Sequence, residues 1–570
     1  MTNNKTTLTP KFKCTKKGLF YFDSQSKKRK VSGYIEVSSF GHYSDSTHWL
    51  AQVKYIDMDG TYKELLIPRD ELRKAMAMRD LLLLSGFVFP VEKENASLLL
   101  KYLELASPKD RFEISEKTGW VGKDYVFPEA IIGSNTCSLV YCPPPHSEKC
   151  EKATSGSIED WQKTVAANAV YSSRVTFAIC VSLGAALIRI TGIESGGFNF
   201  VGPSSKGKTT SLRAAQSVYE KAGQGDLPTW DITATGLDEL AVQHCDRILV
   251  LDELARLSAD EKNTVKIVRD VSYRLASGKG RIRSAHFKNK GNPTHWRTLL
   301  LSSSETAMSV LALSVGNGRP KGEEVRFIDV PAIVSSKNGV YERVPEGISP
   351  IELSESIEMA CNDNYGSIGR AFISKIVDDY DAVSDLVNGL VEEFVEDANL
   401  PDIGWEHRFA KRFALAYAAG VIGIKFGLLP WQKDEMKKAI LSCYLDAREA
   451  VPDFEHLLSE AFKDIRKKMK RRKSFRDLRK EPPKGKGPSV VKARGFIKSD
   501  GKHGVFYVIK KSSFERWAGK HLPYHLVAKH LKEREYLVTT GRNLPTKQVS
   551  VSGIKRKRRY YCIKKSFLDD

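Results

Sequence analysis

The chain has 570 residues, of which 41% are hydrophobic and 28% charged. At roughly 100–200 residues per domain, this length predicts three or four domains, each with its own core. The 25 Phe, 21 Tyr and 8 Trp exclude disorder as the main state of the chain.

The uncharged run between Arg174 and Arg189 is shorter than the ~20 residues that a bilayer requires. The N-terminus has no apolar signal region, and the nine cysteines follow no regular spacing. We therefore expect a cytoplasmic protein with reduced thiols and no membrane partner.

The positive charge is concentrated in the last fifth of the chain. The net charge is +21, but residues 463–570 hold 33 Lys/Arg and nine Asp/Glu, a net of +24, whereas the remaining 462 residues have a net of −3. Such asymmetry is typical of a polyanion partner, most simply nucleic acid. A solvated basic face or contact with anionic lipid is the alternative.

Composition divides the chain into five regions. We expect an N-terminal α+β domain, an α/β core with a parallel sheet, a helical lid, a basic linker and a C-terminal winged-helix-like DNA-binding domain. Their ranges are 1–155, 156–348, 349–468, 469–489 and 490–570.

Local sequence patterns in the first and last domains support this division. In the first domain, residues 49–56 and 62–67 alternate around Asp59-Gly60, which predicts a hairpin, and residues 81–84 and 96–105 favour helices. The last domain is expected to hold strands over 504–509 and 559–563 and a helix over 524–535. These two predicted strands and the helix make a small basic module.

A complete phosphate-binding motif, G-x-x-x-x-G-K-[ST], lies between a predicted strand over 198–201 and a predicted helix over 210–222. Its glycines allow the backbone N–H groups to surround the phosphates of a nucleotide. Lys208 would reach the β- and γ-phosphates, and the Thr209 hydroxyl would ligate Mg²⁺. The expected nucleotide-binding residues are Gly202, Pro203, Ser204, Ser205, Lys206, Gly207, Lys208, Thr209 and Thr210.

A second apolar strand over 247–251 ends in Asp252 and Glu253, 44 residues after Lys208. Beside a phosphate loop, Asp252 can hold the metal and Glu253 can act as general base on the attacking water. The cofactors expected are therefore ATP and Mg²⁺.

Two further strands complete the expected sheet. Residues 296–301 end in a polar tip, residues 302–305, where a sensor of the γ-phosphate would lie. Residues 325–330 form the other strand, and Arg326 at its mouth is a candidate arginine finger for a neighbouring subunit or, alternatively, an ordinary salt-bridge residue.

Residues 279–293 form a basic insertion before the Ser-tipped strand. The turn residues near its end and the alternation of its flanks predict a hairpin, with Arg281 and Arg283 on the stem and Lys288 and Lys290 at the tip. These cations would match a DNA backbone if several copies pointed into a pore. A solvated basic loop is the alternative.

With these elements in order, the chain resembles the AAA+ ATPases of hexameric DNA helicases, of the minichromosome-maintenance type. It resembles more closely a domain-of-unknown-function family of replication helicases carried by plasmids, prophages and chromosomal cassettes. The blocks that carry the resemblance are Thr118-Gly119-Trp120, Tyr125-Val126-Phe127-Pro128, the phosphate loop at Gly202, Leu251-Asp252-Glu253-Leu254, residues 273–280, Trp296-Arg297, residues 301–305, Val325-Arg326-Phe327, Tyr365-Gly366, residues 412–415 and residues 427–431.

The resemblance implies a homo-oligomeric ring, expected to be a hexamer, that couples ATP hydrolysis to movement along single-stranded DNA in its pore, with duplex bound by the C-terminal domain. Lys208, Asp252, Glu253, Ser303 and Arg326 would be its catalytic residues. Ser303 or Ser304 would be the first sensor, since the family shows Ser-Thr-Gly-Glu where this chain has Ser-Ser-Ser-Glu. Candidates for the second sensor are Arg408, Arg412 and Arg370.

The expected function is an ATP-dependent DNA helicase or translocase for replication of a mobile genetic element. The first alternative is an ATP-switched origin-binding initiator or helicase loader without processive unwinding; the second is an AAA+ protein that remodels polypeptides. Cys137, Cys142, His146 and Cys150 are potential zinc ligands, although their spacing fits no common zinc motif.

Overall fold

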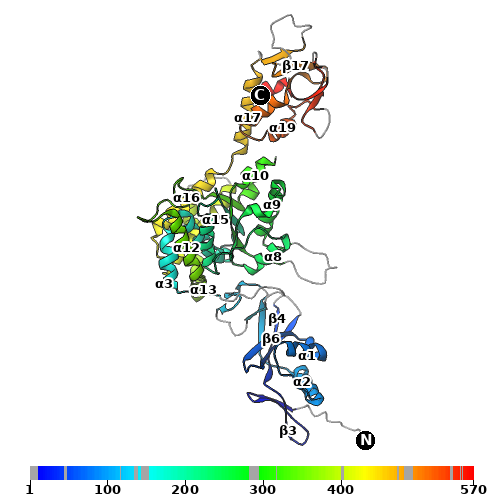
Figure 1. Cartoon of the computed structure of the whole chain (residues 1–570), viewed down its shortest axis with the longest axis vertical. Coiled ribbons are helices and arrows are strands. Elements are labelled where there is room, and N and C mark those ends of the chain that lie inside the picture. The colour runs from blue at the N-terminus through cyan, green and yellow to red at the C-terminus, as the bar shows by residue number, and fades with distance from the viewer. Residues whose placement is uncertain are drawn as a thin grey trace.

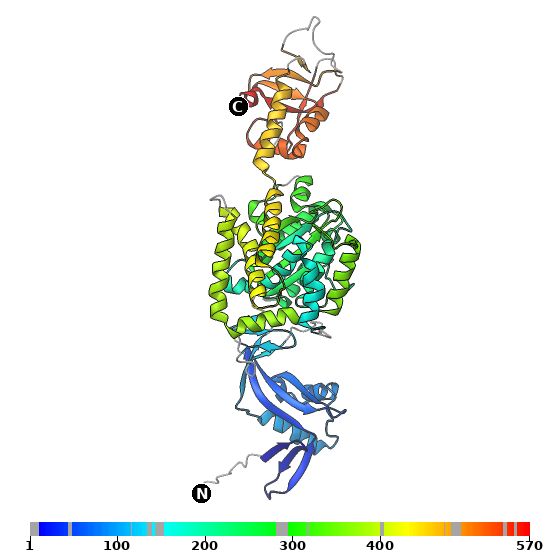
Figure 2. The ribbon, with the colours of Figure 1, turned by 90° about the vertical axis from the view of Figure 1, so that its left-hand side faces the viewer.

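The computed structural model describes residues 11–43, 48–115, 117–133, 139–142, 153–280, 294–315, 318–398, 404–471, 474–479, 492–539, 544–551, 554 and 556–569. They form three units in a row along the long axis of the molecule (Figure 1). The N-terminal unit lies at one end and the C-terminal unit at the other, and the view turned by 90° shows the same order (Figure 2).

The N-terminal unit contains two sheets and two main helices. Its elements are β1 (Lys11–Thr15), β2 (Gly18–Phe22), β3 (Lys28–Ser32), β4 (Ile35–Tyr43), β5 (Trp49–Ile56), β6 (Tyr62–Pro68), η1 (Glu71–Arg73), α1 (Ala75–Leu84), α2 (Lys93–Leu105), β7 (Arg111–Ser115) and β11 (Leu139–Tyr141). The sheets have the strand orders β1-β2-β3 and β11-β7-β4-β5-β6. Leucines of α1 and α2 pack against both sheets in one core.

The predicted hairpin is confirmed, since β5 and β6 pair in antiparallel register. Its turn is held by Asp57, whose Oδ1 accepts hydrogen bonds from the amides of Asp59 (3.0 Å) and Thr61 (2.8 Å). Gly60 adopts φ +80, which only glycine adopts without strain. The two helices predicted in this region are also confirmed, as α1 and α2.

The middle unit is built on a parallel sheet, as the sequence predicts. Its strands are β12 (Gly196–Val201), β13 (Arg247–Leu251), β14 (Thr298–Ser304) and β15 (Phe327–Pro331). They lie in the order β13-β14-β12-β15, and every neighbouring pair is parallel. The carboxyl ends of all four strands therefore lie at one edge of the sheet.

Helices cover both faces of this sheet. Ile248 and Val250 of β13 belong to one hydrophobic cluster, whereas Leu249 and Leu251 belong to another on the opposite face. The elements before and between the strands are α3 (Ile158–Trp161), the π-helical η2 (Gln162–Ala166), α4 (Ala167–Ala169), α5 (Ser173–Gly184), η3 (Ala185–Leu187), α6 (Ile188–Thr191), α7 (Lys208–Ser217), α8 (Ala234–Gln243), η4 (Leu254–Leu257), α9 (Glu261–Ser277), α10 (Met308–Ser314) and α11 (Lys321–Glu324).

The helix predicted over 210–222 is α7, and it ends at Ser217, five residues early. The carbonyls of Ser217 and Val218 accept hydrogen bonds from the amides of Gly366 (2.8 Å) and Gly369 (2.9 Å). These bonds tie the end of α7 to the start of α13 (Ser367–Asp378).

The region from residue 350 to residue 469 is helical, as predicted. Its helices are α12 (Pro350–Asp363), α13 (Ser367–Asp378), α14 (Tyr380–Asp397), α15 (Gly404–Lys425), α16 (Lys433–Glu449) and α17 (Phe454–Met469). The first five share one hydrophobic cluster with α5, α7 and the sheet. By contrast, α17 packs into the core of the C-terminal unit.

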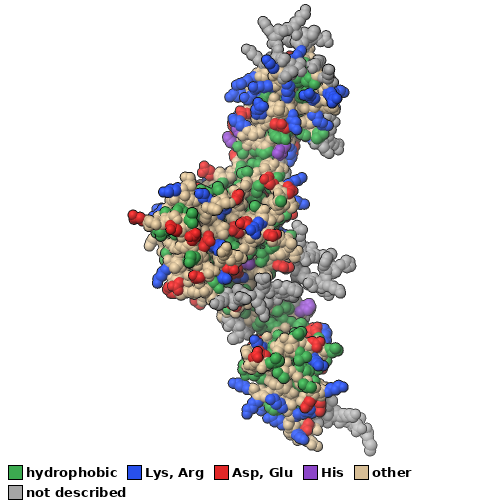
Figure 3. Space-filling view, viewed as in Figure 1, with side chains coloured by type: hydrophobic (Ala, Val, Ile, Leu, Met, Phe, Trp, Pro, Cys, Tyr) green, Lys and Arg blue, Asp and Glu red, His purple; other side chains and the backbone are tan. Residues whose placement is uncertain are grey.

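The C-terminal unit is a small α+β module. Its elements are β16 (Phe475–Asp477), β17 (Gly495–Asp500), β18 (Gly504–Ile509), α18 (Lys511–Ala518), α19 (Tyr524–Glu533), β19 (Lys547–Val549), β20 (Arg558–Lys564) and η6 (Lys565–Leu568). The sheet order is β16-β17-β18-β20-β19. The two strands and the helix predicted here are confirmed within two residues, and Lys and Arg side chains are dense on this unit (Figure 3).

One helical stretch, Ser173–Thr191, is long and apolar enough to cross a membrane. Every residue from 172 to 188 is buried inside the middle unit. The stretch therefore has the character of a core helix of a folded domain.

A small antiparallel sheet of β8 (Gly119–Val121), β9 (Asp124–Val126) and β10 (Ile131–Ile132) docks on the middle unit. Trp120 and Tyr125 are buried in the core of that unit. Their common partner is Asp246, which is fully buried: its Oδ2 accepts from the Trp120 amide (2.9 Å), and its carbonyl accepts from the Tyr125 hydroxyl (2.8 Å).

Asp246 also pairs through both carboxylate oxygens with Arg297, at 2.7 Å each. One buried carboxylate thus joins the segment between β7 and β11 of the N-terminal unit to the start of β13 and the start of β14. Such bidentate pairs are among the stronger polar contacts in proteins.

Replacing Asp246 with Ala should leave the Arg297 guanidinium and the Trp120 amide without their acceptor. We expect a loss of about 3 kcal/mol, seen as a decrease of roughly 5–10 °C in the midpoint of thermal unfolding. The matched control is Asp381→Ala, because Asp381 pairs with Lys123 of the same docked segment but both side chains are exposed. Equal midpoints for the two variants would contradict the role given to Asp246.

Candidate nucleotide-binding site

The phosphate loop lies at the carboxyl edge of the sheet, between β12 and α7. Two of its residues adopt left-handed backbone conformations, Ser205 with φ +56 and Gly207 with φ +90. A Cβ on Gly207 would come within 2.5 Å of the Val340 side chain. The tight curvature of the loop therefore depends on glycine at this position, and it directs the amides at the start of α7 toward one point.

All nine predicted nucleotide-binding residues belong to this loop and to the first turn of α7. Thr210 differs from the rest, since its hydroxyl donates to Glu358 of α12 at 2.8 Å. That hydroxyl is thus engaged in packing against α12.

Lys208 is the buried cation of the site, with 8% of its surface exposed. Its ammonium donates to the carbonyls of Gly202 (2.6 Å) and Pro203 (2.7 Å), so the lysine lies across its own loop. Burial lowers its pKa, while the nearby carboxylates of Glu305 and Asp252 oppose that shift. An incoming phosphate would replace the carbonyls as partner and supply the missing counter-charge.

Asp252 is the centre of the site. Its Oδ2 accepts a hydrogen bond from the Thr209 hydroxyl at 3.0 Å, and its Oδ1 accepts from the Ser303 hydroxyl and the Glu253 amide. Only 7% of Asp252 is exposed. The ends of α7, β13 and β14 therefore meet at one carboxylate, the arrangement expected from parallel strands that end at a common edge.

Glu253 has an unusual backbone for a non-glycine residue, with φ +55. Its amide points to Asp252 and also lies 3.3 Å from the Ser303 hydroxyl. Its side chain is about half exposed and pairs with Arg256 in the next turn. The second acid of the pair is thus presented to solvent beside the first, where a water molecule can reach it.

The structure separates the three serines at the end of β14. Ser302 accepts from the indole N–H of Trp230 (2.7 Å), and Ser304 accepts from Asn199 (2.9 Å). Only Ser303 of the three bonds to Asp252. The geometry therefore favours Ser303 over Ser304, the choice that the sequence leaves open.

Glu305 is a residue of the site to which sequence reasoning assigns no role. Its carboxylate accepts a hydrogen bond from Ser204 of the phosphate loop and lies near the Lys208 ammonium. The sequence signal for this residue is an acidic side chain directly after the run of three serines that ends a core strand. The sequence pattern also assigns no role to Asn199 and Asp329. The Asn199 amide donates to the Asp329 carboxylate at 2.8 Å beneath the strand ends.

Arg326 lies at the opposite edge of the sheet. It precedes β15, and its carbonyl accepts from the Gly197 amide at the start of β12 (2.8 Å). Four residues of extended strand lead from Gly197 to Val201, at the start of the phosphate loop. This edge therefore lies about 13 Å from the loop. Its guanidinium donates to Gly322 (2.8 Å) and approaches Glu194 (3.6 Å).

Two of the second-sensor candidates lie beside Arg326. Arg412 is buried, and burial lowers its pKa to about 10, with Glu194 opposing the shift and Arg326 and Arg408 adding to it. Arg408 is exposed one turn earlier on α15. The three arginines thus form a cluster at the edge away from the phosphate loop of their own chain.

Arg370, the third candidate, pairs with Glu129 and lies over the ring of Phe127 at 4.7 Å. It therefore holds the segment after β9 against α13. Its pKa is lowered to about 10 by burial.

The predicted hairpin carries Arg281, Arg283, Lys288 and Lys290, and all four lie outside the described residues. Its two ends are described and pair with each other: Gly280 donates to the Thr294 carbonyl at 2.8 Å, and Lys279 forms an antiparallel bridge with His295. Of the potential zinc ligands only Cys142 is described. Cys137, His146 and Cys150 lie outside the described residues.

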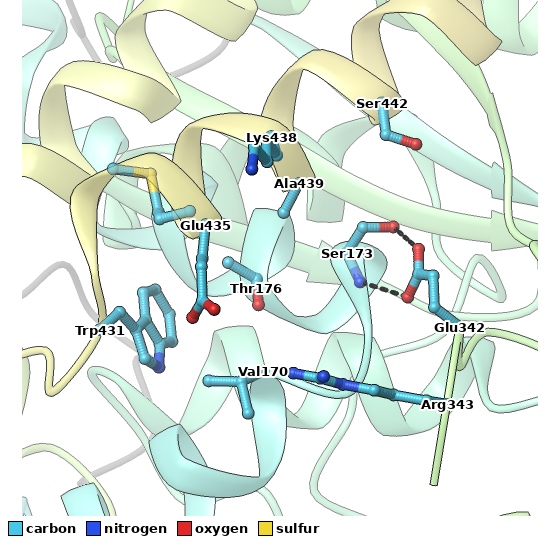
Figure 4. A pocket seen from close by; sticks show the side chains of 11 residues that line it. Val170, Ser173, Thr176, Glu342, Arg343, Trp431, Glu435, Lys438, Ala439 and Ser442 are labelled. Atoms are coloured by element: carbon cyan, nitrogen blue, oxygen red, sulfur yellow. Dashed lines mark hydrogen bonds between the residues drawn. The ribbon is translucent and has the colours of Figure 1, made fainter.

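A cavity of about 370 Å³ lies elsewhere in the middle unit, between α5, α16 and the segment after β15 (Figure 4). Ser173 on its wall donates through its amide (2.9 Å) and its hydroxyl to Glu342. None of its lining residues belongs to the phosphate loop or to the ends of β13 and β14.

Residues 12–293 match a family model described as a domain of unknown function, DUF927. No curated protein matches the chain in sequence. A solved structure described as "SCCmec type IV Cch - active helicase" is 16% identical, with a TM-score of 0.63, and the match covers 98% of this chain and 99% of that one. The two chains therefore share a fold over their whole length.

A second solved structure is described as "The A form apo structure of NrS-1 C terminal region-CTR". It is 12% identical, and the match covers 72% of this chain and 92% of that one. Its TM-score of 0.27 is too low to indicate a shared fold.

Replacing Gly207 with Ala should distort the phosphate loop, because the added Cβ collides with Val340 and the left-handed backbone disfavours it. We expect the affinity for Mg·ADP, measured by fluorescence with a labelled nucleotide, to decrease at least about tenfold. Gly225→Ala is the matched control, since Gly225 has φ +88 but open space around its Cβ position. Unchanged nucleotide affinity in Gly207→Ala would show that the loop does not bind phosphate.

Proposed function

We propose that the protein is an ATP-dependent DNA helicase or translocase that acts as a ring, with six subunits as the expected number. The observation that carries the proposal is the junction at Asp252, where the phosphate-loop threonine, the acidic strand and the serine strand share one carboxylate. The strand order supports an AAA+ assignment, because β14 with its polar tip lies between the phosphate-loop strand and the acidic strand.

The residues present fit ATP and Mg²⁺. Thr209 and Asp252 supply a hydroxyl and a carboxylate oxygen 3.0 Å apart, the hard oxygen ligands that Mg²⁺ prefers. When bound, Mg²⁺ would neutralise charge on the β- and γ-phosphates. Lys208 would bind the same phosphates, and its buried position makes that contact strong.

Glu253 is the proposed general base. Its carboxylate can take a proton from the attacking water once it leaves Arg256, while Ser303 holds Asp252 in place. Glu305 would then orient Ser204 and the loop beneath the terminal phosphate. These residues position the reactants and stabilise charge, which is most of what phosphoryl transfer requires of a protein.

We infer that the catalytic arginine comes from another subunit. Arg326 and the exposed Arg408 lie at the sheet edge away from the phosphate loop of their own chain. A head-to-tail contact would bring that edge against the phosphate loop of the next subunit, and repetition of such a contact gives a ring when the rotation between neighbours closes. The location of the arginine cluster therefore supports hydrolysis at subunit interfaces.

Two parts of the chain are proposed to contact DNA. The hairpin over 279–293 would enter the pore with Arg281, Arg283, Lys288 and Lys290, and its paired ends anchor it beside β14. The C-terminal unit is proposed to be a winged helix, because α17, β18, α18, α19, β19 and β20 follow one another along the chain, with β16 and β17 added after α17, and because β20 lies between β18 and β19 in the sheet. Arg556 and Lys557 directly precede β20, Arg558 and Arg559 begin it, and all four side chains are exposed.

The biological setting is also a proposal. The solved structure that shares this fold is described as an active helicase of an SCCmec element. We propose that the present chain likewise serves replication of a mobile genetic element in the cytoplasm. The DNA-binding C-terminal unit also suits an origin-binding initiator or loader, and strand displacement separates the two functions.

A mixing experiment tests whether the site is shared between subunits. Lys208→Ala keeps the arginine and loses the phosphate contact, whereas Arg326→Ala does the reverse. Each variant alone should lose ATPase activity at least about 100-fold. An equal mixture should regain up to about a quarter of wild-type activity, the share of interfaces with two intact halves in a random ring.

Wild-type protein mixed with an unrelated inactive protein serves as the control for dilution in that experiment. Activity of the mixture equal to the average of the two separate variants would contradict a shared site. Full activity of Arg326→Ala alone would contradict the role of the arginine.

The hairpin is tested by Lys288→Ala together with Lys290→Ala. We expect basal ATP hydrolysis to persist and stimulation by single-stranded DNA to be lost, because the cations that bind the backbone are absent. Lys262→Ala with Lys266→Ala removes the same charge from the exposed surface of α9 and is the control. Stimulation that survives in the hairpin variant would exclude the hairpin from the mechanism.

A further inference from the structure

The three-stranded sheet β1-β2-β3 has one face turned away from the other residues that the structure describes. In the antiparallel pairing, Lys13 lies opposite Phe20 and Phe20 opposite Lys30, while Phe22 lies opposite Lys28. Directly opposed residues project from the same side of a sheet. These five residues therefore share one face, which we name the N-terminal basic face.

The other face of the sheet accounts for its attachment to the N-terminal unit. There Phe12 contacts Tyr21 and Tyr102, each with ring centroids 5.4 Å apart. On the same side Arg29 pairs with Glu92 (3.1 Å), which directly precedes α2, and with Glu94 of α2 (2.6 Å). The sheet is thus anchored through one side, and the N-terminal basic face is left for solvent or a ligand.

The charge of this segment is strongly positive. Residues 11–33 contain eight Lys/Arg and one acid, Asp23, although the chain before residue 463 has a net charge of −3. The carboxylate of Asp23 is engaged by the amides of Gln25 (2.9 Å) and Lys27 (2.8 Å). Lys13, Lys28 and Lys30 are exposed and make no ion pair within the described part of the chain.

Two aromatic rings lie among these lysines. Phe20 and Phe22 are half-buried on the outer face, and the Lys28 ammonium is 4.0 Å from the centre of the Phe20 ring. Side chains two residues apart on one strand are about 7 Å apart. Bases of a B-form strand rise by 3.4 Å per nucleotide. In a single strand stretched to about twice that rise, neighbouring bases would have the spacing of the two rings, so each base could stack on one ring.

We propose that the N-terminal basic face binds single-stranded DNA, with bases stacked on Phe20 and Phe22 and phosphates paired with Lys13, Lys28 and Lys30. Rings on a sheet can stack only with unpaired bases, since the faces of paired bases are covered within a duplex. Phenylalanine has no hydrogen-bonding group, so the face should accept any base sequence. The proposal rests on DNA as the partner of the proposed function and assigns a further binding site to it.

The face lies at the end of the molecule opposite the C-terminal unit (Figure 1). Lys and Arg side chains are visible on both end units (Figure 3). A strand that leaves the middle unit on this side would therefore meet a second, sequence-tolerant contact. The expected result is a longer footprint on single-stranded DNA than the middle unit alone can cover.

Photo-crosslinking of the full chain tests the proposal at residue level. An oligonucleotide of 4-thiothymidine should crosslink to the tryptic peptide of residues 18–27, which holds both rings. Phe20→Leu with Phe22→Leu should lower the crosslink yield in this peptide at least about fivefold, since stacking is lost while the apolar contact is retained. Phe20→Tyr with Phe22→Tyr should restore it.

The lysines are tested by affinity as a function of salt. Lys28→Ala with Lys30→Ala should reduce the slope of log K against log salt by about 1.4 for single strands. Lys93→Ala with Lys101→Ala is the matched control, because both lysines are exposed on α2 of the same unit. Equal slopes for the two double variants would overturn the proposal.

Two other outcomes would also overturn it. One is crosslinking confined to peptides outside residues 11–33. The other is wild-type binding to vesicles of phosphatidylserine that depends on Phe20 and Phe22 while the DNA crosslinks do not. DNA-stimulated ATPase activity measured on the same wild-type sample reports on the proposed function separately, so either proposal can fail alone.

Discussion

The whole site depends on one geometric constraint, the meeting of three parallel strands at a single edge of the sheet. Because β12, β13 and β14 end together, the first turn of α7, the acidic pair and the serine strand converge on Asp252. A buried carboxylate is costly unless its oxygens are hydrogen-bonded, and Thr209, Ser303 and the Glu253 amide meet that requirement here. The same contacts leave its environment suited to a divalent cation beside a phosphate.

The sheet also separates two kinds of charge. Its carboxyl edge holds the phosphate loop and the acids, and its opposite edge holds Arg326, Arg408 and Arg412. That second edge is also where Asp246 and Arg297 fasten the docked segment of residues 119–132. Arg297 directly follows Trp296, whose amide donates to the carbonyl of Gly278 at the end of α9 (3.0 Å). The arginine cluster, the anchor of the docked segment and the chain ends that flank the basic insertion thus lie at the same edge of the sheet.

Much of the fold follows from local pattern in the sequence. The parallel strands, the β5–β6 hairpin, the helices of residues 350–469 and the C-terminal elements are each signalled by periodicity and turn residues. The phosphate loop and Asp252 are signalled by residue type and spacing. Contacts between distant segments carry no such signal: Asp246 with Trp120, Thr210 with Glu358, and Asn199 with Asp329 join residues more than 100 positions apart. The choice of Ser303 over Ser304 required the register of β14, and the location of Arg412 required the packing of α15.

The central claim is that nucleotide is bound between two copies of the chain, and imaging of the assembly tests it most directly. The full chain would be imaged by electron microscopy with single-stranded DNA and a slowly hydrolysed ATP analogue. The account predicts a closed ring, with the triphosphate contacted by Lys208 of one subunit and Arg326 of the next, and with DNA in the central hole. A particle in which the triphosphate contacts one chain alone, with Arg326 facing solvent, would contradict it.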